Sequence, residues 1–407
     1  MNKERLPDGW EWENLDGVTL EYISGGTPST KVTTYWQGSI PWTRSANLTA
    51  NYLKFGEKFI SREAVAETAT NVVPKNNVLV ATRVGVGKAT VNLIDVAISQ
   101  DLTGLVLDVN RILPIYLVYY LHSPKIQRLF EQYSRGTTIQ GIQRSDLSRI
   151  KIPLPPLDTQ RKIVAILDKA EATQRLRAEA DALTQDLPQS VFLEMFGDPA
   201  TNPLEWTIKK LGDVCSEIYR YPTFYGFEYV NSGTPIIRIG NIRQDGIVDP
   251  NLTNYVFIDQ VINDRFPRTK IELYDILMAV RGDGSTAKRI GLVHSNDLIG
   301  ANISPNLLRI KTDGKRLNPI YLFNLLVSES GQKILERYVT RTAKKTITAQ
   351  NIKEISIPIP PLSLQNKFEK LILSTIGTQD TQDQSNVKLS NLFNNISAKA
   401  FTGALIT

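Results

Sequence analysis

The sequence Ile152-Pro153-Leu154-Pro155-Pro156-Leu157 returns almost unchanged as Ile357-Pro358-Ile359-Pro360-Pro361-Leu362 in a chain of 407 residues. We call these stretches the two Pro-Pro segments. Their offset is 357 − 152 = 205 residues, and it holds without a gap from Arg111 and Arg316 to Phe196 and Phe401. Solenoid repeats have periods of only about 20 to 50 residues. The chain is therefore predicted to hold a duplicated domain, and two similar units in one chain predict pseudo-two-fold geometry.

Each half joins a divergent front to this constant back. Short β-branched runs, such as residues 77–82 and 275–280, are broken by Gly, Pro and Asn and predict strands. We expect one helix in each half, from Pro114 to about Tyr133 and from Pro319 to about Tyr338, because Pro is tolerated in the first turn of a helix. Each front is therefore predicted to be mixed α and β.

A long helix is predicted after each Pro-Pro segment, the first from about Leu157 to Phe196. Steps of three, four and seven residues indicate a coiled-coil-like seam. The predicted apolar stripes are Ile163, Leu167, Ala170, Ala180, Leu183 and Leu187 in the first helix, and Phe368, Ile372, Leu392 and Ile396 in the second. We expect the helices to pack antiparallel on each other as a spacer; the alternative is two helices packed on ordinary domains. About 30 helical residues span ~45 Å, the length of ~13 base pairs.

The predicted fold class is α+β, with two tandem mixed α/β globular domains separated by two long antiparallel coiled-coil-like helices. The predicted boundaries are 1–152 for the first domain, 153–198 for the central helix, 199–357 for the second domain and 358–407 for the C-terminal helix.

Composition restricts the class of protein. A hydrophobic share of 42% is enough to build real cores, and the net charge of +6 suggests an anionic partner. The chain has no long apolar run and no charged-apolar-small leader at Met1, so we expect no membrane span and a cytoplasmic location. With a single cysteine, Cys215, and only His122 and His294 beside it, we expect neither a disulfide nor a metal site, and we expect Cys215 in the core.

The sequence offers no recognisable catalytic motif. Gly85-Val86-Gly87-Lys88-Ala89-Thr90 resembles part of a phosphate loop, but Thr82 occupies the position of its first glycine and Ala89 follows the lysine. A tight turn between strands is the better interpretation. Zinc spacing, a Gly-x-Ser-x-Gly elbow and the motifs of an adenine methyltransferase are also missing.

Side chains suited to DNA recur in both fronts. Arg and Asn pair bidentately with guanine and adenine edges, and basic turns contact phosphates. Structural hydrogen bonds and a solvated surface explain the same residues equally well. The predicted DNA contacts are Arg44, Asn47, Arg83, Lys88, Arg135, Thr137, Thr138, Gln140, Arg238, Asn241, Arg281, Lys288, Arg289, Arg341, Lys344 and Lys345.

The chain resembles, over essentially its whole length, a specificity (S) subunit of a type I restriction-modification system. The resemblance rests on the paired Ile-x-Ile-Pro-x-Pro-Pro-Leu-x-x-Gln segments (150–160 and 355–365), the long helix after each, the opening Leu6-Pro7-x-Gly9-Trp10 and Ser24-Gly25-Gly26-Thr27-Pro28. It implies that each front is a target recognition domain that reads one half of a bipartite, asymmetric DNA site, and that the helices form the spacer.

The resemblance also implies a chain that is not itself an enzyme. Two methyltransferase (M) subunits would dock on it and two restriction (R) subunits would join, with S-adenosylmethionine, ATP and Mg on those partners and no cofactor on this chain. The implied partner contacts are Pro155, Pro156, Leu157, Gln160, Pro360, Pro361, Leu362 and Gln365.

Three other interpretations stay open at this point. The chain could target a related system whose partner fuses methylation and cleavage, it could be a stand-alone enzyme acting on nucleic acid, or it could be a duplicated scaffold that does not bind DNA.

Overall fold

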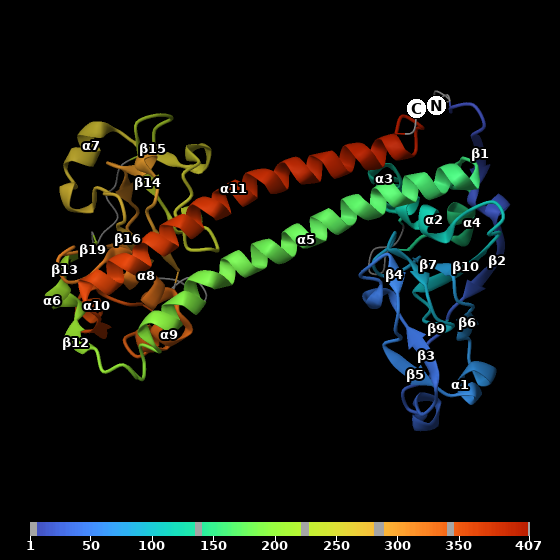
Figure 1. The fold of residues 1–407 in the computed structure, drawn as a ribbon, viewed down its shortest axis with the longest axis horizontal. Helices are drawn as coiled ribbons and strands as arrows, with labels where there is room; N and C mark the ends of the chain where they lie inside the picture. Colours follow the sequence, from blue (N-terminus) through green and yellow to red (C-terminus); the bar gives the residue numbers. More distant parts are fainter. Residues whose placement is uncertain (1–5, 135–140, 221–227, 281–288, 340–345, 406–407) are drawn as a thin grey trace. The chain divides into compact units, whose positions relative to one another are not determined.

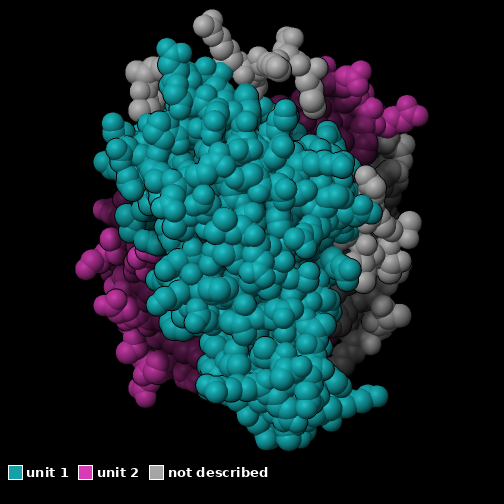
Figure 2. All heavy atoms as spheres, turned by 90° about the vertical axis from the view of Figure 1, so that its right-hand side faces the viewer, with its two compact units in different colours: residues 1–178, 385–407 teal, residues 179–384 magenta. Residues whose placement is uncertain are grey.

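The computed structural model describes residues 6–134, 141–220, 228–280, 289–339 and 346–405. The chain divides into two compact units, coloured separately in Figure 2. Unit 1 consists of residues 1–178 and 385–407, and unit 2 of residues 179–384. Each unit thus combines one globular front with a part of each long helix, whereas the predicted boundaries keep the helices as separate segments.

Unit 1 contains three sheets among its described residues. The strand of the first Pro-Pro segment, β11 (Lys151–Leu154), pairs antiparallel with β1 (Glu11–Asn14). The order of the five-stranded sheet is β2 (Thr19–Ser24), β10 (Leu102–Leu107), β7 (Asn77–Ala81), β8 (Ala89–Asn92) and β4 (Tyr52–Leu53). The order of the four-stranded sheet is β5 (Lys58–Ile60), β3 (Ile40–Thr43), β9 (Val96–Ile98) and β6 (Asn71–Val73).

Unit 2 repeats this plan. The second Pro-Pro segment forms β20 (Ser356–Ile359), which pairs antiparallel with β12 (Thr207–Lys210). The order of the larger sheet is β13 (Cys215–Tyr219), β19 (Leu307–Thr312), β16 (Ile276–Ala279) and β17 (Ile290–Leu292), and that of the smaller one is β15 (Val256–Ile258), β14 (Thr234–Ile237) and β18 (Asn302–Ile303). In both units the central strand of the smaller sheet, β3 or β14, pairs antiparallel with one neighbour, β5 or β15, and parallel with the other, β9 or β18. Unit 1 adds a further antiparallel pair, β6–β9. The predicted duplication is confirmed at the level of strand order.

Four short helices, labelled in Figure 1, recur in the described part of each unit, and unit 2 has a fifth, α6 (Leu211–Val214), where unit 1 has the 3-10 turn η1 (Leu15–Val18). Unit 1 has α1 (Arg62–Glu67), α2 (Pro114–Leu121), α3 (Pro124–Tyr133) and α4 (Arg144–Ser148); unit 2 has α6 (Leu211–Val214), α7 (Gln260–Asp264), α8 (Pro319–Val327), α9 (Glu329–Glu336) and α10 (Ala349–Lys353). Single turns of 3-10 helix are η1 (Leu15–Val18), η2 (Thr33–Trp36), η3 (Ser45–Asn47), η4 (Ile239–Asn241), η5 (Leu252–Asn254), η6 (Pro267–Thr269) and η7 (Asn296–Leu298).

The prediction of one helix after Pro114 and one after Pro319 is wrong, because each splits into two. In unit 1, Pro124 has no backbone N–H to continue α2 and starts α3 instead. In unit 2, Ser328 ends α8 and caps α9, since its hydroxyl accepts the N–H of Gly331 at 3.0 Å.

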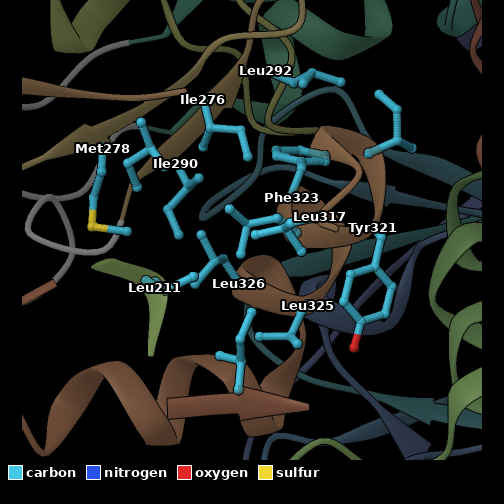
Figure 3. Packing of buried hydrophobic residues seen from close by; sticks show 14 of the residues in the cluster. Leu211, Ile276, Met278, Ile290, Leu292, Leu317, Tyr321, Phe323, Leu325 and Leu326 are labelled. Carbon is cyan, nitrogen blue, oxygen red and sulfur yellow. The ribbon is translucent and has the colours of Figure 1, made fainter. Parts of the chain in front are cut away.

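The core of each unit is built around α2 or α8. Figure 3 shows Phe323 and Leu326 of α8 on the side of the helix that faces Ile276 and Ile290 of the sheet. The other side of α8 meets the long helices, where the ring of Tyr321 packs on Phe196. A helix buried on both sides explains why α8 is apolar apart from Tyr321 and Asn324, whose polar groups are hydrogen-bonded.

The two long helices are α5 (Leu157–Phe196), with the predicted bounds, and α11 (Leu362–Ala400). In unit 1, Arg177 Nε donates to Asn386 Oδ1 at 3.2 Å, and in unit 2, Gln382 Nε2 donates to Thr184 Oγ1 at 3.1 Å. Higher numbers on α5 thus meet lower numbers on α11, so the predicted antiparallel pairing is confirmed.

The predicted apolar seam is wrong for the middle of this pair. Ile163 and Leu167 at one end of α5 are fully buried, but Leu183 and Leu392 are 74% and 55% exposed. The helices meet there through the polar side chains just described. Apolar packing on α5 and α11 is confined to their ends, where the globular fronts contribute to it.

Candidate nucleic-acid interface

Gln160 joins the first Pro-Pro segment to the start of α2. Its Oε1 accepts the N–H of Leu113 at 2.8 Å, and its Nε2 donates to the carbonyl oxygens of Arg111 at 2.8 Å and Pro155 at 2.9 Å. The side chain is 0% exposed. It therefore acts as an internal bracket, and its burial speaks against the predicted contact with a partner protein.

Gln365 makes the same bracket in unit 2. Its Oε1 accepts the N–H of Asn318 at 2.8 Å, and its Nε2 donates to the carbonyl oxygens of Arg316 at 3.0 Å and Pro360 at 2.7 Å. It is also 0% exposed. The amide thus recurs because it has two donors and an acceptor, which match one N–H and two carbonyls.

Four of the other six predicted partner contacts form a repeated surface. Pro155 and Pro360 are buried, whereas Pro156 and Pro361 are exposed and Leu157 and Leu362 are half-buried. In unit 1 this surface borders a pocket of about 460 Å³, whose lining includes Trp10, Glu11, Arg111, Pro156 and Leu157. An exposed proline beside an aromatic ring and a charged pair is suited to protein contact.

Arg44 and Arg238 occupy equivalent places in the two units. Each precedes a 3-10 turn, η3 or η4, at the end of β3 or β14. The strands correspond as well, since Pro41 lies opposite Phe59 and Pro235 opposite Phe257. We call the segments that follow these strands the β3–β4 loop (residues 44–51) and the β14–η5 loop (residues 238–251).

The polar groups of these two loops differ. The guanidinium of Arg44 is bidentate to Glu57, with Nε–Oε2 at 2.8 Å and Nη2–Oε1 at 2.9 Å, and its side chain stays 52% exposed. Arg238 is exposed, and Asn47 is half-exposed. Asn241 is only 4% exposed; its Oδ1 accepts the N–H of Arg238 at 2.9 Å and its Nδ2 donates to the carbonyl of Asn254 at 3.2 Å. These bonds speak against the predicted role of Asn241 as a base contact, because its amide is used to shape the loop.

The predicted basic turn of unit 1 is a tight turn. Arg83 and Lys88 are exposed at its two ends. The N–H of Gly87 donates to the carbonyl of Ala81 at 3.1 Å, and φ is +76° at Gly85 and +90° at Gly87, which favours glycine. The tight-turn interpretation of residues 85–90 is therefore confirmed, and both cations remain accessible.

Of the remaining predicted DNA contacts, Arg289 lies within the described residues and the others do not. Arg289 is half-buried, directly before β17. Outside the described residues lie Arg135, Thr137, Thr138, Gln140, Arg281, Lys288, Arg341, Lys344 and Lys345.

A polar cluster in unit 1 escaped the sequence analysis. Asn51 Nδ2 donates to Glu171 Oε2 at 2.6 Å, and the Tyr119 hydroxyl lies 2.8 Å from that same oxygen and 2.6 Å from Asp168 Oδ1. Burial, followed by the two carboxylates, raises the pKa of Tyr119, so its hydroxyl keeps its proton. Asn51 and Glu171 are 120 residues apart, and no local pattern connects them.

A second missed cluster lies in unit 2, where Arg309 is 3% exposed. Its Nε donates to Asp275 at 2.7 Å, its Nη2 to Glu272 at 3.0 Å and its Nη1 to the carbonyl of Arg268 at 3.1 Å. Burial raises the pKa of Asp275, against the opposing effect of the guanidinium. The equivalent position in unit 1 is Gly104, because the equivalent strands β10 and β19 begin at Leu102 and Leu307, and 309 − 205 = 104. This cluster therefore stabilises one unit and is not part of the repeat.

The described part of the chain has neither a candidate metal site nor a membrane-spanning helix. No group of three His, Cys, Asp or Glu residues there could hold a metal ion, and none of the helices described is both long and apolar enough to cross a membrane. Cys215 is a free thiol packed against the core of unit 2, where burial raises its pKa to about 12.

Comparison with known proteins agrees with this geometry. The family model of the type I restriction modification DNA specificity domain matches residues 7–183 and 203–389. The MjaIX specificity subunit of Methanocaldococcus jannaschii is 22% identical over 399 residues, which cover 90% of this chain and 87% of that protein. The EcoR124I/EcoR124II specificity subunit of Escherichia coli is 27% identical over 188 residues, 45% of each chain.

Two solved structures share the fold. One is a chain from a study of assembly and conformational transition in a type I restriction-modification system, with a TM-score of 0.62, 20% identity and coverage of 98% of this chain and 100% of that one. The other is the S subunit from M. genitalium, with a TM-score of 0.59, 14% identity and 98% coverage of both chains. Because the family model matches both halves of the repeat, the chain belongs to the type I restriction-modification specificity subunits, with two tandem copies of the DNA specificity domain.

Proposed function

We propose that each unit of this non-catalytic specificity subunit reads one half of a bipartite, asymmetric DNA site. The observation that carries the proposal is the contrast between the β3–β4 loop and the β14–η5 loop, which follow equivalent strands with different polar groups. Arg44 is ion-paired and Asn47 is half-exposed, whereas Arg238 is exposed and Asn241 is buried. Equivalent loops with different donors and acceptors suit two unlike half-sites, because base edges are read by the arrangement of those groups.

The basic turn of unit 1 supports contacts to the DNA backbone. Arg83 and Lys88 are exposed at its two ends, and phosphate contacts position a protein on DNA without reading its sequence. Two accessible cations on one short turn suit that role, and the net charge of +6 favours an anionic partner.

We further propose two M subunits and two R subunits as partners. The duplicated surface around Pro156, Leu157, Pro361 and Leu362 supports one M subunit for each copy. Large apolar residues on the long helices are also exposed and offer additional contact area. These residues are Leu176, Leu183, Leu187, Leu193, Leu371, Val387 and Leu392. S-adenosylmethionine, ATP and Mg would then belong to the partners, and we propose a cytoplasmic location for the complex.

The test is to co-express the chain with the genes that neighbour its own, and to map methylated adenines in the host DNA. The neighbours expressed alone are the control. A split, asymmetric motif that depends on this chain, and whose halves change separately when residues 1–150 or 200–355 are exchanged, would support the proposal. A stable complex with an active methyltransferase and no motif would overturn it and favour the scaffold interpretation.

A further inference from the structure

In each unit, the loop that carries the predicted base contacts is tied to the long helix that follows the same unit's Pro-Pro segment. In unit 1 the tie joins Asn51, at the end of the β3–β4 loop, to Glu171 of α5 at 2.6 Å. In unit 2 it joins Arg243, in the β14–η5 loop, to Asp383 of α11, with Nη2 and Oδ2 3.9 Å apart. The offset of 205 residues makes α5 and α11 equivalent helices, so a loop-to-helix tie is common to both units.

The tie in unit 1 is short and partly buried. Asn51 is 8% exposed, and the Tyr119 hydroxyl of α2 braces the Glu171 carboxylate from a second element at 2.8 Å. The backbone of Asn51 is held as well, because its carbonyl accepts the N–H of Val91 in β8 at 2.9 Å. The end of the loop is therefore fixed to the sheet and to α5 at the same residue.

The tie in unit 2 is long and exposed. The side chain of Asp383 is 67% exposed, and the guanidinium of Arg243 also binds Asp245 within its own loop. The position equivalent to Glu171 is Ile376, since 171 + 205 = 376, and it is 6% exposed within the apolar core. An exposed pair at this separation contributes little. The two units thus differ in how firmly the loop is held.

We propose that Glu171 is a positioning residue for DNA reading by unit 1, because it fixes the β3–β4 loop to α5 through Asn51. The inference rests on the proposed function, since this loop carries Arg44 and Asn47. A bidentate contact to a base needs its donors in place to a fraction of an ångström, and losing one such contact reduces discrimination about 5- to 150-fold. A loop released from α5 would keep its side chains but lose this placement.

The experiment measures discrimination by the complete complex with its methyltransferase partners. Initial methylation rates are compared on the cognate duplex and on duplexes with one base changed in either half. Asn51→Asp sets a carboxylate against Glu171 and Asp168, so we expect discrimination at one half-site to fall about ten-fold or more while the other half is unchanged. Asp158→Asn is the matched control: it neutralises a carboxylate on the same helix that is 87% exposed, and we expect wild-type discrimination.

A rescue separates positioning from general stability. Combining Asn51→Asp with Glu171→Gln reverses donor and acceptor across the same hydrogen bond, and we expect discrimination at the affected half-site to return. If Asn51→Asp prevents assembly, Glu171→Ala removes the acceptor without adding charge and is measured in the same way. Wild-type discrimination in these variants, equal loss at both half-sites, or no return in the double variant would overturn the inference. A wild-type complex that shows no sequence dependence would overturn the proposed function instead.

Discussion

Replacing Gln160 by methionine tests whether this residue is an internal bracket or a contact for a partner protein. Methionine keeps the length of the side chain but removes the one acceptor and the two donated hydrogen bonds that join Leu113, Arg111 and Pro155. At about 1 kcal/mol for each lost bond, the free energy of unfolding of unit 1 should fall by about 3 kcal/mol. A unit of this size loses about 2–4 °C in Tm per kcal/mol, so we expect a decrease of about 6–12 °C.

Scanning calorimetry of the full chain measures this loss, and titration with the methyltransferase subunit well below the Tm measures partner affinity. The matched control is Pro156→Ser, because Pro156 is exposed on the same segment while Gln160 is buried. We expect Gln160→Met to lower the Tm with little effect on partner affinity. We expect Pro156→Ser to weaken partner affinity with little effect on the Tm. An unchanged Tm with weaker binding for Gln160→Met would refute the bracket and restore Gln160 as a direct partner contact.

Three further substitutions or treatments probe the individual units. Arg309→Met leaves the carboxylate of Asp275, which is 2% exposed, without its cation. We expect the free energy of unfolding of unit 2 to fall by about 3–5 kcal/mol, measured by urea unfolding. Adding Asp275→Leu should recover part of that loss, and a double variant no more stable than Arg309→Met would contradict the argument. Phe401→Ala removes a 6% exposed ring that packs edge-on against Tyr116 and Tyr120, with ring centroids 5.5 and 5.0 Å apart. We expect the free energy of unfolding of unit 1 to fall by about 3–5 kcal/mol. Hydrogen exchange should then become faster in α2 but not in α8. Burial raises the pKa of Cys215 from 9.0 to about 12, so iodoacetamide at pH 8 should label it only after unfolding. Because the folded thiol keeps a proton that the unfolded thiol loses, its contribution to stability should decline above pH 9. Rapid labelling of the native chain would refute this placement.

The duplicated plan and the bounds of α5 could be predicted because they depend on local sequence. The constant offset between the Pro-Pro segments predicts two related units, and the residues that begin α5 follow its Pro-Pro segment directly. The correspondence of Arg44 with Arg238 was also visible, since each follows a strand proline at the same spacing.

The roles of individual polar side chains could not be predicted in the same way. Gln160 looks like a surface residue in sequence, but its bonding partner Leu113 lies 47 residues away. Glu171 reaches Asn51 across 120 residues. The predicted apolar seam of α5 was wrong in its middle because helical spacing identifies an apolar face but not the element that packs against it. Leu183 lies on that face and is exposed.

The division of the chain into units has a consequence for the order of events during synthesis. Unit 2 is one continuous stretch, residues 179–384, whereas unit 1 also needs residues 385–407, where Phe401 enters its core and Gly403 packs against Pro7. Domains generally fold as they emerge from the ribosome, N-terminal first. Here the unit whose residues emerge first is the last to become complete, so its apolar surface around Tyr116 and Tyr120 stays uncovered until residues 385–407 have also emerged.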